Sequence, residues 1–224
     1  MTATSARSWH ALTAAVAVFA LILQLVLVIT GHGTLVEDDQ PGLGVRLGRL
    51  VSYFTIQSNV LVAVAALTLA RDPARDGTGW RVLRLGGLVG ITVTGLVHFL
   101  LLRPLLDLQG WNAFCDRLLH MVVPLLVVIG WAAFGPRPRV TARVVAWALA
   151  WPVAWLAWTL AMGVATGWFP YPFLDVDEEG WGPVLATSAA ITALFLALFG
   201  LVALLDRRLP RAPGPGQDVI PGSG

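Results

Sequence analysis

The chain of 224 residues is 57% hydrophobic and only 12% charged, with a mean hydropathy of +0.75. A soluble domain carries about 25% charged residues, so this composition excludes an ordinary soluble enzyme. All the basic residues are arginines, and we attribute the formal charge of +2 to side chains beside anionic lipid rather than to a nucleic-acid surface.

Apolar runs of about 20 residues, the length that crosses a bilayer, follow one another along the chain. They cover residues 9–31, 48–70, 82–103, 116–134, 143–166 and 181–205. The first run is longer than the apolar part of a signal peptide and no small-residue cleavage motif follows it, so we expect it to be retained. We therefore predict an all-α integral membrane protein, with a bundle of six transmembrane helices in residues 9–206 between an N-terminal segment, 1–8, and a disordered tail, 207–224.

The distribution of arginine predicts the orientation of these helices. Of the 15 arginines, eleven fall at the two ends and in the second and fourth loops, and four fall near the odd-numbered loops. The positive-inside rule then places both termini in the cytoplasm. A chain rich in Ala, Gly and Val and devoid of lysine is typical of a high-GC bacterium, so we expect a multi-pass protein of the bacterial cytoplasmic membrane.

The second run carries an unusual group of polar residues in the stretch "YFTIQSN". Ser52, Thr55 and Asn59 are spaced i, i+3 and i+7, which places them on one face of a helix, and Gln57 lies beside that face. Polar groups in hydrocarbon cost free energy unless they are paired. We expect these side chains either to pack against other helices or to line a site.

Two histidines lie inside the third and fourth runs. His98 precedes Arg103 by five residues, about 7.5 Å, and His120 follows Arg117 by three, about 4.5 Å. Both therefore lie in the outer half of the membrane, near the depth predicted for Thr55. An isolated threonine is more typical of packing, because its hydroxyl can bond to the carbonyl one turn back, whereas a histidine inside a span is by default a functional candidate.

Two further features concern the surroundings of His120. Pro124 has no N–H, so the carbonyl of His120 loses its helical partner and the helix should kink there. Such a break is tolerated where protein or a cavity covers it. The segment 167–181, "GWFPYPFLDVDEEGW", is either a structured cap over a cavity or an interfacial aromatic belt.

The stretches "YFTIQSNVL", "LLHMVVPLLVVIGW" and "YPFLDV" resemble bacterial members of the androgen-induced-gene superfamily (FAR-17a-like), which includes the androgen-dependent TFPI-regulating protein. The likeness covers the core of six spans. It implies an intramembrane threonine hydrolase that cleaves lipid esters, such as fatty acid esters of hydroxy fatty acids. By this resemblance Thr55 is the nucleophile and His120 its base.

This chemistry needs partners that the chain can supply. A hydroxyl becomes nucleophilic when a neutral histidine within about 2.6–3.2 Å takes its proton. Asn59 or Ser52 is the expected oxyanion donor, and Asp116, one turn before His120, is the nearest acid that could orient the ring. We expect His98 to converge on the same cavity and a lipid or acyl ester to be the substrate.

Two other classes of function remain open. One is a b-type haem or metal protein held by His98 and His120. The single cysteine, Cys115, excludes an internal disulfide, and no Cys/His spacing resembles a zinc site; the hydrolase interpretation needs neither metal nor cofactor. The other is a non-enzymatic lipid-binding or transport component, although a transport path should show polar residues at several depths.

Overall fold

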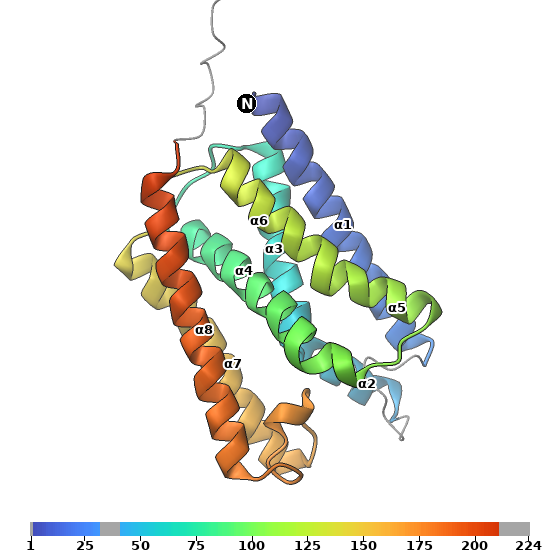
Figure 1. Cartoon of the computed structure of the whole chain (residues 1–224). Helices are drawn as coiled ribbons and strands as arrows, with labels where there is room; N and C mark the ends of the chain where they lie inside the picture. The colour runs from blue at the N-terminus through green and yellow to red at the C-terminus, as the bar shows by residue number, and fades with distance from the viewer. Residues whose placement is uncertain (1, 32–40, 211–224) are drawn as a thin grey trace, which may run out of the picture.

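The computed structural model describes residues 2–31 and 41–210, and in this part of the chain it is all-α. Six helical segments are long and apolar enough to cross a membrane. They are α1 (Ala3–Ile29), α3 (Phe54–Arg71), α4 with the turns after it (Thr78–Leu105), α5 to α6 (Gly110–Phe134), α7 (Ala142–Thr166) and α8 (Trp181–Arg208). This is the architecture of a multi-pass membrane protein. The start of α1 and the end of α8 lie at the same end of the bundle (Figure 1).

The first and last helices are longer than the apolar runs that predicted them. Helix α1 begins at Ala3, because the Thr2 hydroxyl caps it by accepting a hydrogen bond from Ser5 N at 3.2 Å. Helix α8 continues to Arg208. Part of the predicted terminal segments is therefore helical, and the rest of the tail, from residue 211, lies outside the described residues.

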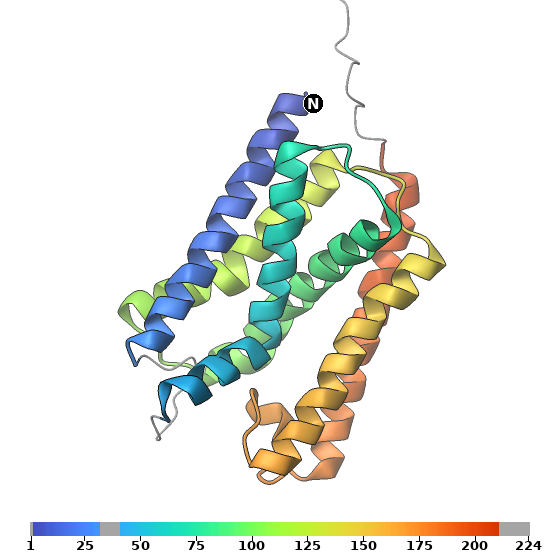
Figure 2. The ribbon, with the colours of Figure 1, turned by 180° about the vertical axis from the view of Figure 1, so that it is seen from behind.

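The second span is broken, which corrects the prediction of one helix over residues 48–70. Helix α2 (Leu43–Ser52) ends at Tyr53, whose extended backbone (φ −66°, ψ 128°) starts α3 in a new direction (Figure 2). Two carbonyls freed by the break accept side-chain hydrogen bonds: Ser52 O from Trp155 Nε1 at 2.9 Å, and Val51 O from Gln57 Nε2 at 3.0 Å. Backbone groups away from water need such partners; the bond from Gln57 is local and exposed, whereas the bond from Trp155 ties the break to α7.

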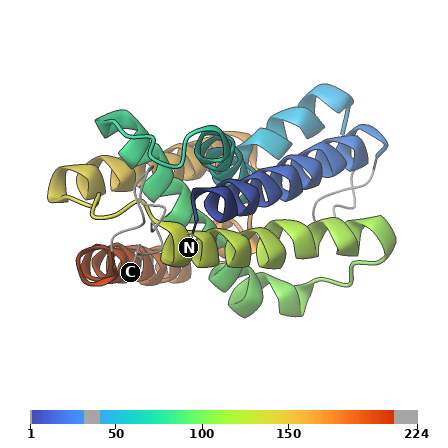
Figure 3. The same cartoon turned by 90° about the horizontal axis from the view of Figure 1, so that it is seen from above.

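Helix α4 lies in the middle of the bundle, with α1 and α6 on one side and α7 and α8 on the other (Figure 3). Glycines on α4 allow this close packing. A Cβ at Gly90 would lie 2.8 Å from the Trp151 ring of α7, and one at Gly87 would lie 3.2 Å from Leu61 of α3. Gly86 and Gly90 are four residues apart, a pairing of small residues that is typical of close packing between helices, and both lie against the Trp151 ring.

Candidate active site

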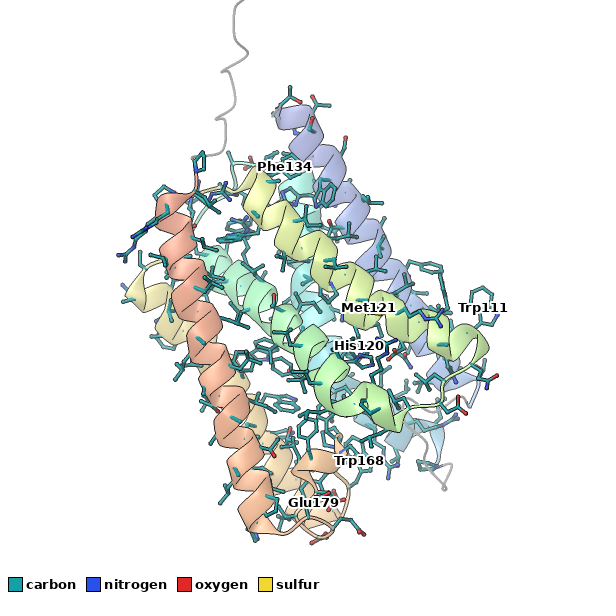
Figure 4. All side chains as sticks on the ribbon, viewed as in Figure 1. Trp111, His120, Met121, Phe134, Trp168 and Glu179 are labelled. Carbon is teal, nitrogen blue, oxygen red and sulfur yellow. The ribbon has the colours of Figure 1, made fainter. Side chains whose placement is uncertain are left out.

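The hydroxyl of Thr55 faces the ring of His120. Thr55 is the second residue of α3 and is buried, and its Oγ1 lies 3.2 Å from His120 Nε2. Figure 4 shows His120 in the interior, where the segment from α5 to α6 crosses α4, whereas Trp111 points away from the bundle. The structure therefore brings together the two residues that we expected to converge, at a distance suited to proton transfer.

Both histidines lie on π-helical turns, which interrupt two neighbouring spans. His98 begins η1 (His98–Leu102) and His120 lies in η3 (Leu118–Val122). Pro124 follows η3 and cannot donate to His120 O, so the expected kink takes the form of a wider turn. The backbone of α4 covers the freed carbonyl closely, because a Cβ at Gly95 would lie 3.0 Å from His120 O.

Asp116 lies between the two histidines. Its Oδ1 is 2.9 Å from His120 Nδ1 and 3.0 Å from His98 Nε2, and its backbone carbonyl is 3.0 Å from His120 Nδ1. Both acceptors favour a proton on Nδ1 of His120, which leaves Nε2 free to accept the proton of Thr55. The two rings stack at a centroid distance of 4.0 Å and an interplanar angle of 13°.

Tyr171 is the site residue that the sequence did not single out. It belongs to the connection between α7 and α8, and its hydroxyl lies 3.3 Å from Thr55 N and 3.4 Å from Thr55 Oγ1. The connection therefore covers the site as a structured cap. This is one of the two alternatives that the sequence left open for segment 167–181. Burial raises the pKa of Tyr171, so its hydroxyl stays protonated. In the structure Thr55 N donates to this hydroxyl, and with an ester bound both groups can donate to an oxyanion instead.

The other polar residues of "YFTIQSN" are bonded elsewhere. Asn59 Nδ2 donates to Thr55 O at 2.9 Å and to Leu119 O at 3.4 Å, so it joins α3 to η3. Ser52 Oγ donates to Gly48 O at 2.8 Å, on the far side of the helix break. Gln57 Oε1 accepts from Trp151 Nε1 at 3.0 Å. In the structure, therefore, Asn59 links two spans and Ser52 bonds within α2; their role as oxyanion donors stays a prediction.

Two cavities meet at Thr55. The larger one, the apolar chamber, has a volume of about 320 Å³ and lies among α4, α7 and α8. The smaller one, the polar chamber, has a volume of about 60 Å³ and lies on the side of α1 and α5. Both are lined by Thr55, His98, Leu102 and Tyr171.

One set of side chains in the described part of the chain has the composition of a metal site. His98, Asp116 and His120 each offer one ligand atom, and these atoms lie within 4.8 Å of one another. Two histidines and a carboxylate suit a divalent transition metal. They do not suit a haem in this arrangement, because axial ligands face each other across the macrocycle, whereas these rings are stacked.

No family model, curated protein or solved structure matches the chain. The geometry around Thr55 and the motif resemblance are therefore the two pointers to a function, and the resemblance stays an expectation.

Proposed function

We propose that the protein is an intramembrane threonine hydrolase that cleaves lipid esters. The observation that carries the proposal is the 3.2 Å contact between Thr55 Oγ1 and His120 Nε2 at the mouth of an apolar chamber. Asp116 on the other side of the imidazole completes the order of nucleophile, base and acid that activates a hydroxyl. The resemblance to the androgen-induced-gene superfamily supports the same roles for Thr55 and His120.

The reaction follows the two-step course of covalent catalysis. His120 Nε2 takes the Thr55 proton while Oγ1 attacks the ester carbonyl carbon, and the resulting oxyanion accepts hydrogen bonds from Tyr171 and Thr55 N–H. The C–O bond to the alcohol then breaks, and His120 gives its proton to the departing oxygen. A water molecule loses a proton to His120, attacks the acyl-threonine, and releases the carboxylic acid as the proton returns to Thr55.

The proposed setting is the outer leaflet of a bacterial cytoplasmic membrane. The split of arginines between the two sides supports cytoplasmic termini, and His120 lies well away from the start of α1 (Figures 1 and 4). Val153 lines the apolar chamber and is 54% exposed on the lipid-facing side of α7. Membrane lipids are therefore both the surroundings of the protein and the proposed source of its substrate.

The test uses purified protein and a long-chain ester. Thr55→Ala and His120→Ala should each lower turnover by about 10²–10⁴-fold, and the double variant should be little worse, because members of one catalytic unit are non-additive. Thr55→Ser should keep part of the activity, since it retains the oxygen. Near-normal turnover by Thr55→Ala would show that Thr55 is a packing residue.

A divalent metal centre is the second candidate, favoured by the grouping of His98, Asp116 and His120. It predicts that the purified protein retains about one metal ion per chain, and that His98→Ala and Asp116→Asn lose it. Metal analysis of the three proteins, without any activity assay, decides the question. A metal-free wild-type protein that also fails to bind added Zn²⁺ or Co²⁺ would exclude this candidate.

A further inference from the structure

The two chambers that meet at Thr55 differ in size and in the number of hydrogen-bonding groups in their walls. The walls of the apolar chamber run along Val93 to Leu102 of α4, Leu149 to Leu156 of α7 and Ser188 to Phe195 of α8. Hydroxyls in these walls are partly used within the protein, since Thr94 Oγ1 donates to Ser58 and Thr192 Oγ1 donates to Ser188 O. The chamber therefore presents mostly hydrocarbon to a ligand, and burial of an alkyl chain there is favourable.

The polar chamber is small, and hydrogen-bonding groups share its walls with apolar side chains such as Ile56 and Leu106. Its walls include the side chains of Gln24, Asn112, Asp116 and His120. Asn112 Oδ1 is buried and makes no hydrogen bond to a described residue. At about 60 Å³ this chamber has room for a few water molecules or a short alcohol, given that one water needs roughly 10–15 Å³.

The position of His120 orients an ester between these chambers. An ester has two arms on its carbonyl carbon, the acyl chain and the alcohol, and the alcohol oxygen must receive the proton that His120 carries. His120 lines the polar chamber but not the apolar chamber. The alcohol arm therefore lies in the polar chamber, and the acyl arm lies in the apolar chamber.

We infer that the substrates are esters that join an apolar acyl chain to a small polar alcohol, and that esters with a bulky alcohol are poor substrates. This inference rests on the proposed function. In the catalytic cycle the released alcohol leaves through the polar chamber, and the water that completes hydrolysis enters the space that the alcohol vacates, beside His120. The acyl chain stays in the apolar chamber until Thr55 is released.

Two isomeric esters test the orientation. Ethyl octanoate and octyl acetate have the same atoms and nearly the same apolar content, but their long arms lie on opposite sides of the carbonyl. We expect kcat/KM for ethyl octanoate to be at least about tenfold higher, which corresponds to about 1.4 kcal/mol in the transition state. Equal rates, or faster hydrolysis of octyl acetate, would overturn the orientation and leave the proposed function in place.

The same assay separates the two proposals. If wild-type protein hydrolyses neither ester, the proposed function fails and the orientation fails with it. If it hydrolyses both and Thr55→Ala hydrolyses neither, the proposed function stands, and the ratio of the two rates decides the orientation alone.

A variant that fills one chamber gives an independent result. Ile191 lines the apolar chamber, whereas Leu196, on the same helix, lies outside both chambers and is 52% exposed to lipid. Ile191→Trp should lower the rate with ethyl octanoate at least about tenfold more than the rate with ethyl acetate, and Leu196→Trp should change neither. An equal loss with both esters in Ile191→Trp, at unchanged melting temperature, would contradict the placement of the acyl chain.

Discussion

Two pairs of threonine and histidine lie in different parts of the bundle, and only one of the two histidines, His10, is fully buried. Thr55 and His120 form the candidate active site, whereas Thr13 and His10 lie on α1 and line a cavity of about 40 Å³ with Arg84. The hydroxyl of Thr13 donates to Trp9 O at 2.9 Å, one turn back on its own helix. The hydroxyl of Thr55 instead faces an imidazole from another span.

The charged neighbours of the two histidines also differ. His120 has the carboxylate of Asp116 beside it, which stabilises the imidazolium that forms during proton transfer. His10 shares its cavity with the guanidinium of Arg84, so an imidazolium there would face a like charge. The residue types are the same at both ends. The direction of the hydroxyl and the sign of the adjacent charge distinguish a catalytic pair from a packing pair.

Of the variants that compare the two pairs, Tyr171→Phe should have the largest effect on kcat. No tyrosine among the described residues lines the cavity of His10, so this variant affects only the candidate active site. Tyr171→Phe removes one oxyanion donor, and such a loss lowers kcat by about 10²–10³-fold. The phenyl ring keeps its packing against Tyr53 and Phe173, so the melting temperature should change little. Turnover and thermal unfolding of the same sample measure both quantities. A loss of stability that matches the loss of activity would make Tyr171 a packing residue only.

A second variant tests the end that lacks catalytic chemistry. Asp206 is buried at the end of α8, and its Oδ2 accepts hydrogen bonds from Arg139 N at 2.6 Å and Val140 N at 2.8 Å. Asp206→Ala leaves these N–H groups without an acceptor and should lower the free energy of unfolding by about 1.5–3 kcal/mol. The kcat of the remaining folded protein should stay normal. If kcat is reduced under conditions in which all of the Asp206→Ala protein is folded, the contacts of Asp206 also influence the candidate active site.

Asp116 gives a smaller effect at the active site. Its backbone carbonyl also lies 3.0 Å from His120 Nδ1, so Asp116→Asn should keep the ring oriented and lose only the charge. We expect kcat to fall about tenfold, or about 1.4 kcal/mol, less than for Thr55→Ala. A fall as large as that of Thr55→Ala would mean that the carboxylate, and not the backbone, fixes the tautomer of His120.

The smallest effect is expected for the packing pair itself. Thr13→Ala removes one hydroxyl that bonds to the backbone, and a hydrogen bond within a membrane protein averages about 0.6 kcal/mol. Turnover should match the wild type within error, which makes Thr13→Ala the matched control for Thr55→Ala. A decrease in turnover without unfolding would mean that Thr13 also contributes to activity and is not only a packing residue.

The sequence predicted that Thr55 and His120 converge, and Pro124 predicted the irregular turn beside His120. The missing proline N–H fixes that turn locally. The depth of the two residues in a membrane stays a prediction. The role of each residue in hydrolysis stays a prediction.

The features that were missed depend on contacts between distant segments. No proline or glycine marks the helix break at Tyr53, so Ser52 was placed on the wrong helix. At the break, the side chains of Trp155, from α7, and of Gln57 donate hydrogen bonds to the carbonyls of Ser52 and Val51. The hydroxyl of Tyr171 reaches Thr55 from 116 residues away. Spacing along the chain contains no information about that contact. An aromatic segment that caps a cavity is the only signal that pointed toward it.

The π-helical turn at Leu118–Val122 makes the site depend on the length of the chain as well as on its side chains. A turn of this kind accommodates one residue more than an α-helix does. Deleting a single residue from it would remove the wider turn and change the position of His120 relative to α6, so that its ring no longer meets Thr55 as it does now. An in-frame deletion of one codon would then separate the proposed nucleophile from its proposed base while both residues remained encoded.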